Sequence, residues 1–300
     1  MTHADEWMPD RQFPTMSSPG KVIRLGRLVG QTDGRCLFVT IAHGLLRGPI
    51  PREVKAAQFG PLARELCGAG ADGIVVSPGF LGCNAAYLAG HNAKGIILCL
   101  EWNNSFRDMV SGLGFSEGRS AMIGTIEDAV RLGADAVMTY VFLGHDDPEV
   151  EAAHVSRNAA LSRECERLGV VRVIETMSRG GRMVDADTRR KDYVAMHARI
   201  ASEIGCDLIK TEWTGDEGSF REVVEACLVP VLVAGGPQES DPVDALRMVE
   251  QALRAGAIGV VFGRNIIQAS NPVGMVTALH GVVHQGMTPN EAGKRAGLKS

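Results

Sequence analysis

The sequence predicts an α/β protein with the architecture of a (β/α)8 TIM barrel, and three observations lead to that prediction. Eight short runs rich in valine and isoleucine recur along the 300-residue chain, and short turns that contain glycine introduce them. Helical patterns lie between the runs. One strand–helix unit therefore repeats roughly every 30 to 40 residues, as the crossover between parallel strands requires. Eight such units favour a closed barrel, which needs about 250 residues, over an open doubly wound sheet.

The eight runs have the pattern of strands that are buried on both faces, because apolar and polar residues hardly alternate within them. In chain order, these predicted strands are 36–41, 73–76, 95–100, 136–143, 170–176, 207–211, 230–234 and 258–262.

Between the strands, apolar residues recur at the spacing of amphipathic helices. Thr125 and Asp128 form a capping box that opens a helix ending at Gly133. The other expected helices are 52–66, 149–168, 188–204, 217–227 and 241–255. No internal linker is evident, so we expect a single barrel domain over 31–300, preceded by a polar N-terminal extension over 1–30.

Composition narrows the classes of function. The net charge is −4, aromatic residues make up 5%, and no dense stripe of lysine and arginine occurs, which argues against a nucleic-acid partner. Seven scattered cysteines without a C-x-x-C pair fit a reducing, cytoplasmic setting. Residues 1–14 lack the apolar core of a signal peptide, and proline and glycines interrupt the uncharged segment 73–93. We therefore expect no secretion and no membrane span.

Two motifs favour structural interpretations. The G-x-G-x-x-G pattern at 68–73 closes a helix and opens a strand, whereas a dinucleotide site needs the opposite order, so we expect a helix-ending turn. His280 and His284 are four residues apart without a third ligand, so we expect a pair on a helix surface and no metal site.

Glycines follow the last two predicted strands. Gly235 and Gly236 end the seventh, and Gly263 and Arg264 end the eighth. In this fold the loops after strands seven and eight commonly bind phosphate through backbone N–H groups, and Arg264 can add charge. The alternative is that both are simple tight turns.

Lys210 ends the sixth predicted strand, where the catalytic groups of such barrels converge. Desolvation there would favour the neutral amine, which can attack a carbonyl. A lysine ion-paired with Glu212, Glu175 or Asp216 is the alternative, and spacing does not decide between them.

Three segments of the chain resemble the archaeal-type class I aldolase family. They are I-K-T-E-W-T-G-D-E-G-S-F-R at 209–221, V-L-V-A-G-G-P at 231–237 and G-A-I-G-V-V-F-G-R-N-I at 256–266. That family includes fructose-bisphosphate aldolases, aminodideoxyheptulosonate synthases and a phospho-dione thiolase. The resemblance implies that Lys210 forms a Schiff base with a phosphorylated ketone. It further implies no metal or other cofactor, because the protonated imine is the electron sink, and a homo-oligomer, with a decamer of pentameric rings as one form.

Two positions depart from the family pattern. The family reads D-H-G after strand one, where this chain has Ala42-His43-Gly44, and it carries an acid/base tyrosine where this chain has Phe142. Neither replacement can transfer a proton. Tyr140, two residues before Phe142 and on the same strand face, is one substitute. The other substitutes are Glu101, Glu175 and His43, each near a strand end, with packing or structural ion pairs as the alternatives.

The sequence therefore predicts a Schiff-base aldolase or related carbon–carbon lyase of carbohydrate metabolism that acts on a small phosphorylated ketone or ketose. The alternatives are a thiolase-like acyltransferase that acts on a phosphorylated dione and a phosphosugar-binding relative without turnover. The identity of the second substrate is not encoded in any motif.

Overall fold

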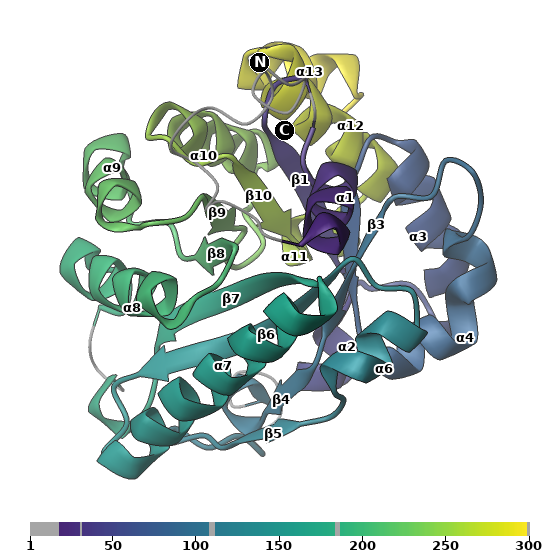
Figure 1. Cartoon of the computed structure of the whole chain (residues 1–300). Coiled ribbons are helices and arrows are strands. Elements are labelled where there is room, and N and C mark those ends of the chain that lie inside the picture. The colour runs from purple at the N-terminus through teal and green to yellow at the C-terminus, as the bar shows by residue number, and fades with distance from the viewer. Residues whose placement is uncertain (1–17, 31, 108–111, 184–186, 299–300) are drawn as a thin grey trace, which may run out of the picture.

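The barrel predicted from the sequence is confirmed by a computed structural model, which describes residues 18–30, 32–107, 112–183 and 187–298. Eight parallel strands close in the order β1-β10-β9-β8-β7-β6-β3-β2, and helices surround them (Figure 1). The strands are β1 (Cys36–Thr40), β2 (Gly73–Val76), β3 (Gly95–Cys99), β6 (Ala136–Leu143), β7 (Val171–Ser178), β8 (Leu208–Thr211), β9 (Val231–Ala234) and β10 (Gly259–Phe262).

Both faces of these strands are buried, as the lack of alternation predicted. In β1, Phe38 packs inside the barrel, whereas its neighbours Leu37 and Val39 pack outward against the helical layer. The interior is filled by side chains such as Val75 and Ile97, so the barrel is a packed core.

The helices follow the predicted pattern, with two wrong boundaries; the helix expected from residue 188 begins at Lys191. Thr125 caps α6 through the Asp128 N–H at 3.0 Å, and the capping box is confirmed. The helix expected from residue 52 instead begins at Phe59, because Arg52 has a φ of +64° and Lys55 is extended. The helices of the outer layer are α2 (His43–Arg47), α3 (Phe59–Gly68), α4 (Pro78–Leu88), α6 (Ile126–Arg131), α7 (Pro148–Leu168), α8 (Lys191–Ile204), α9 (Glu217–Ala226), α10 (Pro242–Arg254), α11 (Arg264–Ile267), α12 (Pro272–Gln285) and α13 (Pro289–Arg295).

Two further elements had no signal in the sequence patterns. Helix α4 is apolar around much of its circumference, so it lacks the one-sided periodicity that predicts a helix. The short strands β4 (Glu101–Asn103) and β5 (Ser120–Met122) pair antiparallel outside the barrel, and they carry the chain away from the end of β3.

The described part of the expected N-terminal extension contains helix α1 (Pro19–Leu28), which packs at the N-terminal ends of β3 and β7. Lys21 Nζ lies 2.9 Å from Asp207 Oδ1, and Arg27 Nη1 lies 3.0 Å from Asp135 Oδ1. Both aspartates immediately precede or begin a barrel strand. Residues 19–28 therefore cover the end of the barrel opposite the expected site.

A repeated aspartate fixes the register at this closed end. In each G-x-D turn before a strand, the carboxylate accepts a backbone N–H from the neighbouring strand. The distances are 2.8 Å from Leu37 N to Asp72, 3.0 Å from Ile96 N to Asp135 and 2.7 Å from Arg172 N to Asp207.

Both motifs given structural interpretations behave as expected. The G-x-G-x-x-G segment joins the end of α3 at Gly68 to the start of β2 at Gly73. His280 and His284 lie on α12, where His280 contacts the Gly70 carbonyl oxygen and His284 bridges Asp33 and Asp72. Within the described ranges, no cluster of three or more potential metal ligands occurs. No helix in that part of the chain has the length and apolarity needed to cross a membrane.

Candidate active site

A cavity of about 310 Å³ lies at the carboxyl ends of the barrel strands. It brings together all but one of the residues predicted from the sequence. Its lining includes Lys210, Tyr140, His43, Glu175, Gly235, Gly236, Gly263 and Arg264.

Lys210 and Glu175 form a buried ion pair in this cavity. Lys210 Nζ lies 2.8 Å from Glu175 Oε2, and the two side chains are only 8% and 6% exposed. The two residues are register partners on β8 and β7, so the sheet itself places them side by side. The two interpretations of Lys210 are thus compatible, because a carboxylate in contact with an ammonium can also accept its proton.

Tyr140 is the register partner of Glu175 on β6 and continues this row of polar groups. Its ring stacks on Phe142 at a centroid distance of 5.2 Å, as the shared strand face predicted. Its hydroxyl lies 3.6 Å from Cys99 Sγ. Burial raises the pKa of Tyr140 well above its ordinary value, so the phenol stays protonated and acts as a hydrogen-bond donor.

Glu101 is the predicted residue that the structure does not bring into the cavity lining. Its Oε1 lies 2.5 Å from Arg157 Nη2, and its Oε2 accepts the Tyr140 backbone N–H at 2.7 Å. The carboxylate is fully buried beneath the strand that carries Tyr140. Glu101 is therefore in the structural ion pair that was its alternative, and it supports Tyr140 from behind.

His43 begins α2 directly after β1 and packs against Gly263, where any side chain would collide with the imidazole and with Thr40. Burial, followed by the charges of Lys210 and Arg264, lowers the pKa of His43 to about 3. Its Nδ1 is buried and has no hydrogen-bond partner among the described residues. The imidazole is therefore neutral, and because the side chain lines the cavity it can hydrogen-bond a substrate oxygen.

The two glycine loops are held together by Asn265, a residue that the sequence did not single out. Its Nδ2 donates to the carbonyl oxygens of Gly235 at 2.7 Å and Pro237 at 2.9 Å, and its Oδ1 accepts from Glu239 N at 2.8 Å. Gly236 has a φ of +64°, a conformation that favours glycine, and open space beside its Cα.

The cavity carries an excess of positive charge. Four arginines and Lys210 line it, against three glutamates, which suits an anionic substrate. Arg47, Arg179 and Arg189 come from loops and α2 and had no readable signal in the sequence. Glu212 also lines the cavity, whereas the sequence indicated it only as an ion-pair partner of Lys210. Burial raises the pKa of Glu212 to about 7, although Arg179 opposes the shift.

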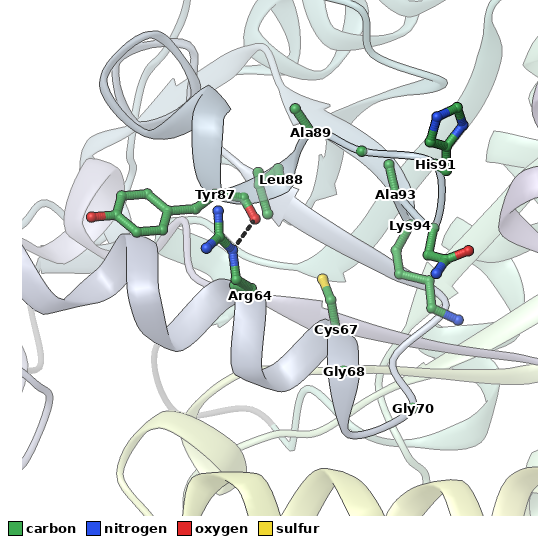
Figure 2. A pocket seen from close by; sticks show the side chains of 12 residues that line it. Arg64, Cys67, Gly68, Gly70, Tyr87, Leu88, Ala89, His91, Ala93 and Lys94 are labelled. Atoms are coloured by element: carbon green, nitrogen blue, oxygen red, sulfur yellow. Dashed lines mark hydrogen bonds between the residues drawn. The ribbon is translucent and has the colours of Figure 1, made fainter.

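A larger cavity of about 590 Å³ lies on the outer surface between α3, α4 and the loop before β3 (Figure 2). None of the catalytic or phosphate-binding residues predicted from the sequence lines it. Arg64 Nε and Nη2 donate to the carbonyl oxygens of Tyr87 at 3.2 Å and Ala86 at 2.8 Å, so this guanidinium caps the end of α4. The cavity at the strand ends is therefore the candidate active site.

Comparisons with known proteins identify the family of the chain. The model of the DeoC/LacD family of aldolases matches residues 36–269. A 2-amino-3,7-dideoxy-D-threo-hept-6-ulosonate synthase of Halobacterium salinarum is 32% identical, covering 94% of this chain and 98% of the relative. A 2-amino-4,5-dihydroxy-6-oxo-7-(phosphonooxy)heptanoate synthase of Streptomyces griseus is 31% identical, covering 92% and 94%.

Solved structures give the same result. An archaeal fructose-1,6-bisphosphate aldolase, whose catalytic lysine is covalently bound to the carbinolamine intermediate of its substrate, superposes with a TM-score of 0.75. It is 28% identical and covers 87% of this chain and 98% of its own.

Proposed function

This chain belongs to the DeoC/LacD family of aldolases, and we propose that it makes or breaks a carbon–carbon bond beside the carbonyl of a small phosphorylated ketone through a Schiff base on Lys210. The observation that carries the proposal is the Lys210–Glu175 pair, buried at the floor of a cationic cavity. The covalent lysine intermediate of the archaeal aldolase supports the same chemistry.

The first step requires a neutral amine. Glu175 accepts the ammonium proton across the 2.8 Å contact, and the freed Nζ attacks the ketone carbon. The carbonyl oxygen takes one proton from the attacking amine and one from the protonated Glu175 and leaves as water, which gives an iminium. Loss of a proton, or cleavage of the adjacent carbon–carbon bond, then places an electron pair in an enamine.

The substrate phosphate binds, in this proposal, to the loops after β9 and β10. Backbone N–H groups at Gly236 and Gly263 approach it closely because no side chain intervenes, and Arg264 supplies charge. Gly235 lines the same wall, but its own N–H donates to the Val261 carbonyl oxygen at 3.3 Å. Asn265 holds the two loops at a fixed separation, which lowers the cost of ordering them around the anion.

Two neutral groups complete the donor-substrate site. The neutral imidazole of His43 and the protonated hydroxyl of Tyr140 hydrogen-bond the oxygens of the ketone and its neighbouring carbon. They occupy the neighbourhood of Ala42 and Phe142, which cannot exchange protons. Both side chains therefore orient the substrate without changing charge near neutral pH.

Borohydride trapping tests the proposal. Incubation with dihydroxyacetone phosphate followed by reduction should add one ketone to the peptide that contains Lys210, and Lys210→Arg should abolish the adduct. Cleavage or exchange activity with the adduct supports an aldolase. An adduct without turnover would instead support a binding relative, which the apolar Ala42 favours, and transfer of an acyl group would indicate the thiolase variant.

A homo-oligomer and a cytoplasmic location remain proposals. Two exposed apolar side chains support a homo-oligomer. Met196 on α8 is 54% exposed, and Leu228, just after the neighbouring helix α9, is 51% exposed. Light scattering at several concentrations would measure the mass, and a monomer at all of them would exclude an oligomer.

A further inference from the structure

A second cavity of about 250 Å³ lies next to the first. The two share the side chains of Arg179, Thr188 and Glu212, so they adjoin at these residues. The other lining residues are mostly small and polar, and they include Ser105, Ser116 and Ser178. A donor ketone bound to Lys210 would leave this second space empty.

We propose that the second cavity receives the electrophilic aldehyde and that Glu212, at the junction, is the catalytic residue that gives its proton to the aldehyde oxygen. This inference rests on the proposed function, because it needs an enamine on Lys210. Ala42 and Phe142 cannot transfer protons, and in this proposal Glu212 supplies the proton instead.

The walls of the second cavity are fixed by hydrogen bonds. Arg179 N donates to the Leu143 carbonyl oxygen at 2.7 Å, and Gly181 N donates to Glu117 Oε2 at 2.8 Å. Gly180 has a φ of +131°, and a side chain there would collide with the backbone of the loop after β6. The segment 178–181 is therefore held against that loop.

Arg179 indicates the chemistry of the aldehyde. Its guanidinium lies over the Phe106 ring at 4.6 Å, and the residue lines both cavities. A guanidinium at this junction attracts an anion and can bind its oxygens through charge-assisted hydrogen bonds. The aldehyde should therefore carry an anionic group, either a phosphate or a carboxylate.

Glu212 can donate a proton near neutral pH. The charged groups around it are Arg179, Glu175, Arg189, Lys210 and Arg264, and burial outweighs the cations so that its pKa is about 7. Glu175 is not free for this step because it already contacts Lys210. In condensation, the enamine carbon bonds the aldehyde carbon, the aldehyde π electrons move to oxygen, and the Glu212 proton neutralises that oxygen. Water then hydrolyses the resulting iminium, which releases the product and regenerates the Lys210 amine.

Glu212→Gln tests the role, with Glu225→Gln on the exposed face of α9 as the matched control. Donor activation is measured by borohydride trapping of dihydroxyacetone phosphate and by exchange of its α-proton in heavy water. Condensation is measured with glyceraldehyde 3-phosphate, succinic semialdehyde and uncharged glyceraldehyde. We expect Glu212→Gln to keep donor trapping within about threefold and to lose about 100-fold in condensation. The wild-type condensation rate should fall as pH rises above about 7, and the variant should lack that decline.

Arg179→Met tests the aldehyde subsite. We expect KM to rise about tenfold or more for whichever anionic aldehyde is used, with little change for glyceraldehyde. Preference for one anionic aldehyde over the other identifies its group as phosphate or carboxylate.

Three outcomes would contradict the inference in distinguishable ways. If Glu212→Gln condenses as fast as Glu225→Gln, Glu212 is not the acid. If the wild type traps the donor but condenses it with none of the three aldehydes, the second cavity is not an aldehyde site. If the wild type forms no adduct with the donor, the proposed function fails, and this inference fails with it.

Discussion

Replacing Glu175 with glutamine should reveal how strongly the barrel depends on the buried pair with Lys210. At 2.8 Å, an effective dielectric of about 20 gives an attraction of about 6 kcal/mol before the cost of desolvation. Removing one partner of such a pair typically destabilises a protein by about 3 to 5 kcal/mol. The amide keeps the size of the carboxylate, so the effect reports charge and not a cavity.

The loss of folding stability caused by Glu175→Gln has an upper limit that depends on pH. The unpaired ammonium can release its proton, which for an ordinary lysine costs about 4.6 kcal/mol at pH 7 and about 1.9 kcal/mol at pH 9. The destabilisation by Glu175→Gln should therefore be about 3 to 4 kcal/mol at pH 7 and no more than about 2 kcal/mol at pH 9.

Urea unfolding at both pH values measures this difference. Glu222→Gln is the matched control, because Glu222 pairs with Lys191 at 2.7 Å while both side chains are about half exposed. Solvent screens that surface pair, so its removal should change the stability little at either pH. The reasoning is refuted if Glu175→Gln is no more destabilising than Glu222→Gln, or if its effect is the same at pH 7 and pH 9.

Three further substitutions test other parts of the structure. His284→Gln should lower the unfolding temperature more at pH 5.5 than at pH 8.5, because Asp72 and Asp33 raise the pKa of His284 against the effect of burial. Stability from the protonated histidine is complete below its unfolded pKa and is lost as pH rises through the folded one, so an equal effect at both pH values would contradict it. Asn265→Ala should raise the KM for the phosphorylated ketone about tenfold. It should also destabilise the protein by about 1 to 3 kcal/mol, since it leaves the Gly235 carbonyl oxygen without its donor. An unchanged KM would show that the two glycine loops do not bind the phosphate. Gly263→Ala should slow adduct formation on Lys210 and lower the denaturation midpoint, because the added methyl collides with His43 and Thr40; trapping at the wild-type rate would show that the imidazole can move aside.

The architecture could be predicted because its signals are local. Strands buried on both faces of a parallel barrel are continuous apolar runs, and each helix that ends in glycine before a strand marks a crossover. Helix α4 could not be predicted in this way, since its apolar residues lie on several sides. Helix α1 lies in the segment that was predicted to be a polar extension, although Leu25 and Leu28 are fully buried under the barrel.

The site was predictable where strand geometry determines it. Tyr140, Glu175 and Lys210 occupy neighbouring strands at matching register, so their side chains must converge. Glu101 also follows a barrel strand, but there the chain leaves the barrel to form β4, and its carboxylate lies beneath the Tyr140 backbone.

Residues that reach the cavity from loops were not predictable. Arg179 and Arg189 depend on the path of the connection between β7 and α8, which follows no sequence period. Glu212 lies just beyond the end of β8, and its role depends on the second cavity, which only the folded loops create.

A crystal structure of the borohydride-reduced complex with dihydroxyacetone phosphate tests the central claim most directly. We predict continuous density from Lys210 Nζ to the former carbonyl carbon, with the phosphate against Gly235, Gly236, Gly263 and Arg264. Density joined to another lysine, or a phosphate bound at Arg179 with the glycine loops empty, would contradict it.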